Sequence, residues 1–319
     1  MIVTLTPNPS QDRTVTLEAP LARGDVQRAV ASTEQAGGKG VNISRACAES
    51  GVATTAVLPL GGDDLFARGL ERLGVRCHTV RHDGALRVNI AITEPDGTTT
   101  KVNSAGPRLD VAVLDALADA VVEEADDADW VVLAGSLPPG APDDWYAGLA
   151  RRLAATPTGV AVDTSDAPLR AVVDALADGP PDLMKPHAEE LASLTGEDPE
   201  RREADLDGVV AAARVLVDAG VGALLVTLGG RGAVLVTAEA AWHAAAPPTT
   251  VVSTVGAGDS SLFGYLLGDL RGLGPADRLA LAVAYGSAAA GLPGTTVPGP
   301  QDVRPDLVTV SPIVPARAG

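Results

Sequence analysis

Short apolar segments alternate with amphipathic segments along most of the chain, and this alternation constrains the fold more than any other feature. Apolar residues three and four positions apart, the spacing of a helix face, recur in residues 109–124 and 205–219. Strand–helix–strand alternation implies a mostly parallel sheet that helices cover on both faces, so the sequence predicts an α/β fold. The candidate strands are residues 2–6, 54–60, 130–134, 160–163, 182–185 and 223–228.

Two segments interrupt the alternation and are predicted to form antiparallel hairpins. Residues 13–35 alternate with period two around a break that contains proline and glycine. Residues 86–103 form two alternating stretches joined by the turn sequence EPDG. We expect a small antiparallel sheet that covers the carboxyl edge of the main sheet as a lid; an edge extension without function is the alternative. The predicted division is a main domain of residues 1–12, 36–85 and 104–319, and a lid of residues 13–35 and 86–103.

The composition of the 319 residues narrows the classes of function. Since 46% of them are hydrophobic, the chain can bury a large core. A net charge of −17 argues against a nucleic-acid partner, because such binding depends on basic side chains that release counterions from phosphates. No run of roughly 18 apolar residues predicts a membrane span, and no export signal is visible at the start, so we expect a cytoplasmic protein. Cys47 and Cys77 lack metal-ligand spacing and are expected to be reduced thiols.

Lysine is scarce, and its positions are informative. Lys39, Lys101 and Lys185 are the three lysines among 24 basic residues. In so acidic a chain an anionic small substrate would need a local basic pocket. Two of the three, Lys39 and Lys185, lie in the motifs described next.

The segment TVGAGDS joins a glycine-rich turn to the start of an amphipathic helix. Such a turn exposes the first backbone N–H groups of the helix, where the helix dipole adds partial positive charge. Gly256, Ala257 and Gly258 are therefore candidates to stabilise a phosphoryl group during transfer. Asp259, in the first turn, is a candidate to accept the proton of an attacking hydroxyl. The alternative is a helix cap after an ordinary loop.

A second glycine-rich segment, EQAGGKGVNISRA, also precedes a predicted helix. Gly37, Gly38 and Gly40 permit close approach of the backbone to a ligand, and Asn42 offers a donor and an acceptor to a sugar hydroxyl. The segment matches neither the P-loop nor the dinucleotide-binding pattern, and a turn without a ligand is the alternative.

Asp12 follows the first predicted strand. Ligands of open α/β sheets bind at the carboxyl ends of the strands, so this carboxylate is placed to hold two adjacent sugar hydroxyls. A solvated loop carboxylate is the alternative.

Six motifs follow one another between an opening TPNPSQD and a closing GLPGTTVPGP: GGKGVN, AGSLPPG, DTS, KPHAEEL, VTLGGRGA and TVGAGDS. Together they resemble the ribokinase-like sugar kinases, specifically the phosphofructokinase B family, essentially from end to end. Within the family the resemblance is greatest to members that phosphorylate fructose 1-phosphate, followed by those that act on tagatose 6-phosphate. It implies ATP-dependent phosphorylation of a sugar phosphate, with Mg²⁺, in a lidded site.

The resemblance also implies roles for matching positions. Asp259 matches the catalytic base, and the turn that precedes it matches the anion hole. Arg87, in the lid, matches a residue that holds the existing phosphate of the substrate; its planar guanidinium suits a pair of phosphate oxygens, and a solvated lid charge is the alternative. The other matching positions are Asp12, Gly38, Lys39 and Asn42 for the sugar, Lys185, Thr227, Gly229 and Gly232 for ATP, and Glu190 for Mg²⁺ through water.

His187 departs from the family pattern, which usually has asparagine at this position. A neutral histidine donates one hydrogen bond and accepts one, but it is bulkier and titrates near neutral pH. We expect His187 to contact the nucleotide in place of the asparagine, with turnover falling as the ring becomes protonated.

The expected reaction converts fructose 1-phosphate and ATP to fructose 1,6-bisphosphate. Tagatose 6-phosphate and fructose 6-phosphate are alternatives, because a furanose ketohexose carries a CH₂O group at each end and a flipped ring has nearly the same outline. A kinase of neutral sugars or nucleosides is disfavoured by Arg87, and a non-catalytic sensor by the intact GAGD. A homodimer joined through the apolar faces of the lids is also expected.

Overall fold

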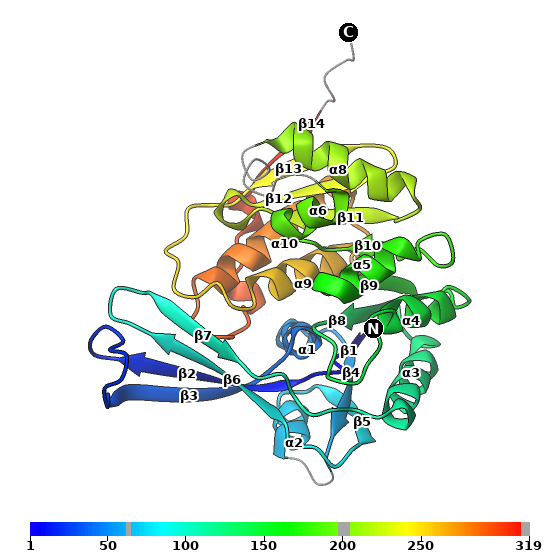
Figure 1. Ribbon diagram of the computed structural model, residues 1–319. Coiled ribbons are helices and arrows are strands. Elements are labelled where there is room, and N and C mark those ends of the chain that lie inside the picture. Colours follow the sequence, from blue (N-terminus) through cyan, green and yellow to red (C-terminus); the bar gives the residue numbers. More distant parts are fainter. Residues whose placement is uncertain (62–64, 197–204, 314–319) are drawn as a thin grey trace.

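Ten strands form the main sheet in the part of the chain that the computed structural model describes, residues 1–61, 65–196 and 205–313 (Figure 1). Their order across the sheet is β14 (Thr309–Ile313), β13 (Ala241–Ala245), β12 (Ala233–Thr237), β11 (Ala223–Thr227), β10 (Leu183–Met184), β9 (Gly159–Asp163), β8 (Trp130–Ala134), β1 (Ile2–Leu5), β4 (Thr54–Leu60) and β5 (Arg76–Arg81). The pairings from β5 to β11 are parallel, and those from β11 to β14 are antiparallel. All six segments predicted as strands belong to this sheet.

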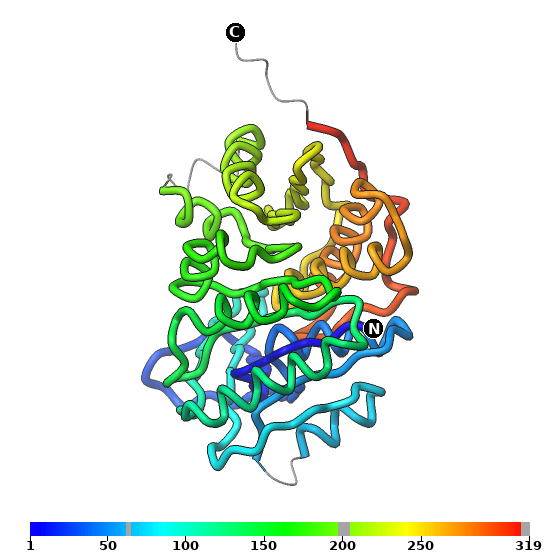
Figure 2. Tube along the Cα trace, turned by 90° about the vertical axis from the view of Figure 1, so that its right-hand side faces the viewer, coloured from blue at the N-terminus to red at the C-terminus, as the bar shows by residue number. Residues whose placement is uncertain are grey.

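Helices cover both faces of the sheet, as predicted. One face carries α3 (Val111–Ala125), α4 (Trp145–Leu153), α5 (Asp166–Asp174), α6 (Ala188–Thr195) and α8 (Leu206–Asp218), and the other carries α1 (Lys39–Glu49), α9 (Ala257–Leu270) and α10 (Pro275–Ala290). In Figure 2 the green helices α5, α6 and α8 lie to the left and the orange α10 lies to the right. α2 (Leu65–Arg72) packs beside β4 in a smaller apolar cluster.

Alternation along each strand explains why the predicted strands are apolar throughout. Val131 and Leu133 of β8 enter the core on one face, while Trp130 and Val132 enter the core on the other. Successive side chains of a strand point to opposite faces, so a strand covered on both sides needs apolar residues at every position. In the described part of the chain, no helix has the length and apolar character needed to span a bilayer.

The lid is a separate sheet of four strands in the order β3 (Ala29–Gly37), β2 (Ser10–Leu17), β6 (Arg87–Thr93) and β7 (Thr99–Asn103), and it projects to one side of the main sheet (Figure 1). Both predicted hairpins form, β2 with β3 and β6 with β7, and each is antiparallel. The hairpins join through β2 and β6, which run parallel, so the lid is a mixed sheet and not the purely antiparallel one expected. β1 and β5 are parallel strands of the main sheet. Since β2 follows β1 and β6 follows β5, both inner lid strands leave the main sheet in the same direction.

The domain boundaries given above stay a prediction. Residues 62–64, 197–204 and 314–319 of the predicted main domain lie outside the described residues.

α9 and α10 pack closely at a glycine of α9, and this contact fixes the helix that begins with the GAGD turn. A Cβ added at Gly264 would lie 2.6 Å from the carbonyl oxygen of Leu281 and 2.9 Å from the Cα of Ala282, both in α10. Phe263 and Tyr285 meet edge to face beside it, with ring centroids 5.1 Å apart. Glycine is therefore required here by the neighbouring backbone, against its poor helix propensity.

Substitution of Gly264 by alanine is expected to destabilise the protein by about 1–3 kcal/mol, because the two backbones must separate. The matched control is Gly148→Ala in α4, where an added Cβ meets nothing within 4 Å. This control should raise the free energy of unfolding by up to about 1 kcal/mol through helix propensity. Chemical denaturation measures both, and a stabilised Gly264→Ala would contradict the close contact.

Candidate active site

All residues assigned a role in the sequence analysis line one of two adjoining cavities at the carboxyl edge of the parallel strands, except Gly37 and Gly40, which pack against Asp12 and Thr6. The larger cavity, of about 780 Å³, lies between the lid and the main sheet. The smaller one, of about 610 Å³, lies over β11 and the starts of α6 and α9. The larger is lined by Asp12, Gly38, Lys39, Asn42, Arg87, Lys185, Glu190, Gly256 and Asp259, the smaller by Gly229, Gly232 and Ala257, and both by His187, Thr227 and Gly258.

The GAGD turn forms an open helix N-terminus, as predicted from the sequence. Gly256 is the N-cap of α9 with φ +80°, a left-handed conformation that favours glycine, and no side chain caps the helix. A Cβ at Gly258 would lie 3.3 Å from the Nζ of Lys185, so glycine also lets this ammonium approach the turn. The first amides of α9 and a lysine thus face the same space, which suits an anion.

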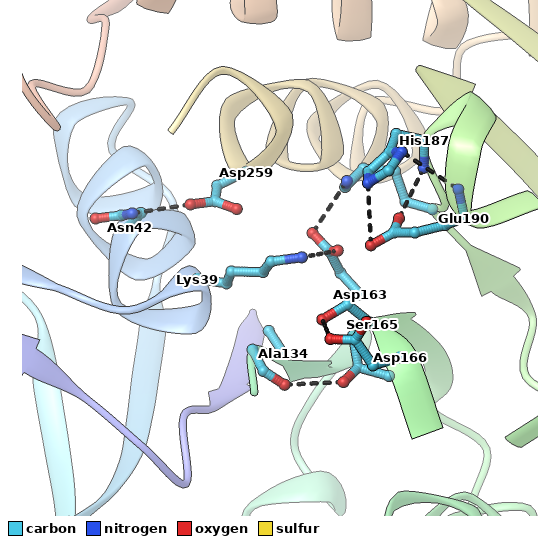
Figure 3. A network of polar contacts seen from close by, with 12 residues as sticks. Lys39, Asn42, Ala134, Asp163, Ser165, Asp166, His187, Glu190 and Asp259 are labelled. Atoms are coloured by element: carbon cyan, nitrogen blue, oxygen red, sulfur yellow. Dashed lines mark hydrogen bonds and ion pairs between the residues drawn. The ribbon is translucent and has the colours of Figure 1, made fainter. Parts of the chain in front are cut away.

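Asp259 is buried in the first turn of α9, with 7% of its surface exposed. Its Oδ2 accepts a hydrogen bond of 2.8 Å from the Nδ2 of Asn42 in α1 (Figure 3). This contact joins two residues that the sequence predicts for the site. Burial, followed by the charge of Asp163, raises its pKa to about 6, although Lys39, Asn42 and Lys185 act in the opposite direction. A carboxylate with this pKa is ionised at neutral pH and is a stronger proton acceptor than an ordinary aspartate.

Asp163 is a site residue to which the sequence analysis assigned no role. It is the last residue of β9, its side chain is wholly buried, and its Oδ1 accepts a 2.6 Å hydrogen bond from the Nζ of Lys39. The Nζ of Lys185 lies 3.2 Å from its Oδ2, at ion-pair distance. Burial raises the pKa of Asp163, but the two lysines more than offset this and hold the pKa below its ordinary value. An acidic residue that directly ends an apolar strand was the available signal.

The predicted sugar contacts lie where the lid meets the main sheet. Asp12 of β2 accepts hydrogen bonds from the Oγ of Ser10 at 2.7 Å and from the Nδ2 of Asn89, of β6, at 3.1 Å. Among the described residues, four side-chain atoms are buried without a hydrogen-bond partner: Thr6 Oγ1, Asn8 Oδ1, Asn89 Oδ1 and Asp163 Oδ2. The first three of these residues line the larger cavity. Buried polar atoms without partners are costly, so this cavity is suited to a ligand rich in hydroxyl groups.

Arg87 is more constrained than the sequence indicates. Its Nε donates to the carbonyl of Asn8 at 3.1 Å and its Nη1 donates to the carbonyl of Ser104 at 3.2 Å, so it ties together two chain segments that connect the lid to the main sheet. Within the described residues its Nη2 has no hydrogen-bond partner. One edge of the guanidinium is therefore left to bind a ligand in the larger cavity.

The smaller cavity has the small residues that a flat ligand requires. Nothing lies within 4 Å of a Cβ added at Gly229 or Gly230, so the backbone there faces open space, and Pro247 and Val251 supply apolar surface opposite. These features fit an adenine nucleotide. Gly232 also lines this cavity, but its own packing already requires glycine, since a Cβ would lie 1.9 Å from the carbonyl oxygen of Ala244.

His187 and Glu190 form a reciprocal cap at the start of α6 (Figure 3). The Nδ1 of His187 accepts from the backbone N–H of Glu190 at 3.3 Å, and the Glu190 carboxylate accepts from the backbone N–H of His187 at 2.9 Å. Histidine here performs the capping that asparagine commonly performs. The described residues contain no cluster of three or more metal-binding side chains, and the Glu190 carboxylate lines the larger cavity.

Comparison with known proteins assigns the family. Residues 8–302 match the model of the pfkB family carbohydrate kinases. The chain belongs to this family. The chain is 38% identical over 304 residues to the 1-phosphofructokinase of Rhodobacter capsulatus, and this match covers 94% of this chain and 93% of that one. It is 36% identical over 305 residues to the 1-phosphofructokinase of Haloferax volcanii, and this match covers 95% of each chain. Its fold is similar to a crystal structure of phosphofructokinase-2 from Escherichia coli in complex with substrates and products, with a TM-score of 0.85 and 30% identity over 94% of this chain and 96% of that one. This pfkB kinase is thus a phosphotransferase of carbohydrates with a ribokinase-like fold, and its family implies ATP as the phosphoryl donor.

Replacement of Asp259 by asparagine is expected to stabilise the kinase at pH 7. A carboxyl with a native pKa of about 6 and an ordinary value of 3.8 binds its proton more tightly in the folded state, so its contribution to stability falls as the pH rises through this window. Removing the charge should therefore raise the free energy of unfolding at pH 7 by up to about 3 kcal/mol, with the difference shrinking toward pH 4. Urea denaturation at both pH values measures this. A variant less stable than the wild type at pH 7 would show that the folded protein does not disfavour the ionised form of Asp259.

Proposed function

We propose that this pfkB kinase transfers the γ-phosphoryl group of ATP to the free primary hydroxyl of fructose 1-phosphate, which yields fructose 1,6-bisphosphate. The observation that carries the reaction type is the position of the GAGD turn, since Gly258 lines both cavities and Asp259 adjoins it on the side of the larger one. The choice of substrate is supported by the named relatives, which are 1-phosphofructokinases at 30–38% identity over most of the chain.

In the proposed complex, the sugar occupies the larger cavity. Asp12, Asn42, Lys39 and the backbone at Gly38 bind its hydroxyl groups, and the free edge of Arg87 binds its existing phosphate. A guanidinium that two backbone carbonyls hold in place presents its remaining N–H groups to phosphate oxygens with little loss of conformational entropy. The reacting hydroxyl then faces Asp259.

The nucleotide occupies the smaller cavity in this proposal. Thr227, Gly229 and Gly232 adjoin the adenosine, while His187 and Lys185 lie toward its phosphates, where the two cavities meet. Glu190 would hold Mg²⁺ through water, and the ion, when bound, neutralises phosphate charge.

The transfer step moves one proton and one phosphoryl group. Asp259 accepts the hydroxyl proton as the oxygen attacks the γ-phosphorus, and the bond to the leaving ADP oxygen breaks. The amides of Gly256, Ala257 and Gly258 and the ammonium of Lys185 stabilise the charge on the moving group. The lid excludes water that would otherwise hydrolyse ATP.

Fructose 6-phosphate is the second candidate substrate, and tagatose 6-phosphate is a third with the same shape. The specific observation in favour of fructose 6-phosphate is the likeness to phosphofructokinase-2 from Escherichia coli, one crystal structure of which is in complex with fructose 6-phosphate, with a TM-score of 0.83 and 28% identity. A ring that binds with its ends exchanged would place its phosphate against Arg87 in the same way.

A coupled assay of ADP release with MgATP tests the proposal by comparing kcat/KM for fructose 1-phosphate, fructose 6-phosphate, tagatose 6-phosphate and fructose. We expect fructose 1-phosphate to be preferred. Asp259→Asn should lower kcat by roughly 10²–10⁴-fold, the usual contribution of a general base, and it serves as the matched control for contaminating kinases. Preference for a 6-phosphate would reverse the orientation of the substrate. Binding of sugar phosphate and ATP without turnover would instead indicate a sensor.

We further propose that two copies of the chain associate through their lids. Val30 of β3 and Val102 of β7, on the two outer lid strands, are 58% and 55% exposed. Sedimentation equilibrium should give a dimer, and the double substitution Val30→Ser with Val102→Ser should weaken it at least tenfold. Val215→Ser, at a 59% exposed position on α8, should leave it unchanged. A wild-type monomer at all concentrations would refute this association.

A further inference from the structure

The Asp163 carboxylate connects the two halves of the site without facing either ligand in the proposed reaction. Lys39, its partner on one side, is the first residue of α1 and adjoins the sugar. Lys185, its partner on the other side, follows β10 and adjoins the GAGD turn. In the described part of the site, no other residue contacts one lysine on the sugar side and another beside the GAGD turn.

This inference rests on the proposed phosphoryl transfer. We propose that Asp163 is a positioning residue, which holds the ammonium groups of Lys39 and Lys185 on either side of the transfer point and keeps their close ionic contacts away from Asp259.

The first part of the role is geometric. A lysine ammonium is a compact charge at the end of a flexible four-carbon chain, with three N–H donors and no preferred direction. Asp163 is fixed by its position at the end of a central strand and by complete burial, so it can hold both ammonium groups in place. Lys39 donates one N–H to Asp163, and the ammonium of Lys185 lies at ion-pair distance from the other carboxylate oxygen, which has no hydrogen-bond partner among the described residues. Both lysines line the larger cavity, where their remaining N–H groups are available to a ligand.

The second part of the role is electrostatic. The groups that act on Asp259 are Lys39 and Asn42 from α1, Asp163 at the end of β9 and Lys185 beyond β10; Glu190 of α6 also acts on Lys39. Two ammonium groups beside a carboxylate would ordinarily lower its pKa. Here both make their close contacts with Asp163 instead, so Asp259 is left with an amide donor and a neighbouring negative charge.

The ionisation states agree with this arrangement. Burial and Asp163 raise the pKa of Asp259 to about 6. Burial alone would lower the pKa of Lys39, but the charge of Asp163, aided by Asp259, more than offsets it and keeps the ammonium protonated. The charge of Asp163 therefore stabilises the protonated form of Lys39 and destabilises the ionised form of Asp259.

A purely structural ion pair is the competing explanation, and it makes different predictions. It would give Asp163→Asn lower stability and less active protein, but the surviving enzyme would keep its pH dependence. A positioning residue that also acts on Asp259 must change the pH dependence of turnover.

The test compares the kcat–pH profiles of the full-length wild type, Asp163→Asn and a matched control, with the sugar phosphate that the wild type turns over. For Asp163→Asn we expect kcat at neutral pH to fall at least tenfold, because the freed lysines stabilise the ionised form of Asp259. The acid limb of the profile should move to lower pH by about one unit or more. The KM for ATP should rise, because Lys185 loses its anchor.

The control is Asp269→Asn at the far end of α9, where the carboxylate accepts a hydrogen bond from the indole of Trp130 and pairs with Arg278. This variant loses an ion pair of the same helix that carries Asp259, and its acid limb should coincide with that of the wild type. Substrate phosphates titrate in the same range in every variant, so the difference between variants is the measured quantity.

An Asp163→Asn enzyme that is folded, with the acid limb and KM of the wild type, would overturn the inference. Should that variant not fold, Asp163→Ser, which leaves room for a water molecule between the lysines, takes its place with the same expected shift. A wild type that turns over none of the sugar phosphates would instead refute the proposed function, so the two failures are distinguishable.

Discussion

The carboxyl edge of the parallel sheet is the constraint on which the site depends. Strands that run in the same direction end at the same edge, so Asp163 of β9, Lys185 beyond β10 and Thr227 of β11 are neighbours although they are far apart in the chain. α1 and α9 begin at this edge and bring Lys39 and Asp259 in their first turns. The architecture thereby gathers charged side chains and helix N-termini around one point, which is where open α/β sheets bind ligands.

Burying charge at that point costs free energy, and the site reduces the cost by pairing. Lys39 and Lys185 share one carboxylate, and together with Asp259 the four groups carry no net formal charge. The pairing is uneven, because Asp163 takes both close ionic contacts and Asp259 takes an amide. The ionised form of Asp259, which has the weaker partner, is stabilised less than that of Asp163. This same property makes Asp259 the better proton acceptor.

The sequence was sufficient to predict features that depend on local pattern. Continuous apolar runs predicted the central strands, two alternating segments predicted the hairpins, and the GAGD turn predicted an uncapped helix N-terminus. What it did not predict depends on the meeting of distant segments. The parallel pairing of β2 with β6 follows from where both hairpins leave the main sheet, and the Lys39–Asp163 contact joins residues 124 positions apart. Spacing along a chain carries no signal for such contacts.

The same kind of long-range contact links the lid to the phosphoryl-binding turn. Gln35 of β3 accepts hydrogen bonds from the backbone N–H and the Oγ1 of Thr295, and its Nε2 donates to the Oγ1 of Thr296. The loop that carries these threonines accepts, through the carbonyl of Gly294, a hydrogen bond from Ser253, three residues before the GAGD turn. A displacement of β3 must therefore either break the contacts of Gln35 or carry this loop with it. Since the loop also holds the segment that leads into α9, the lid and the phosphoryl-binding amides belong to one hydrogen-bond network.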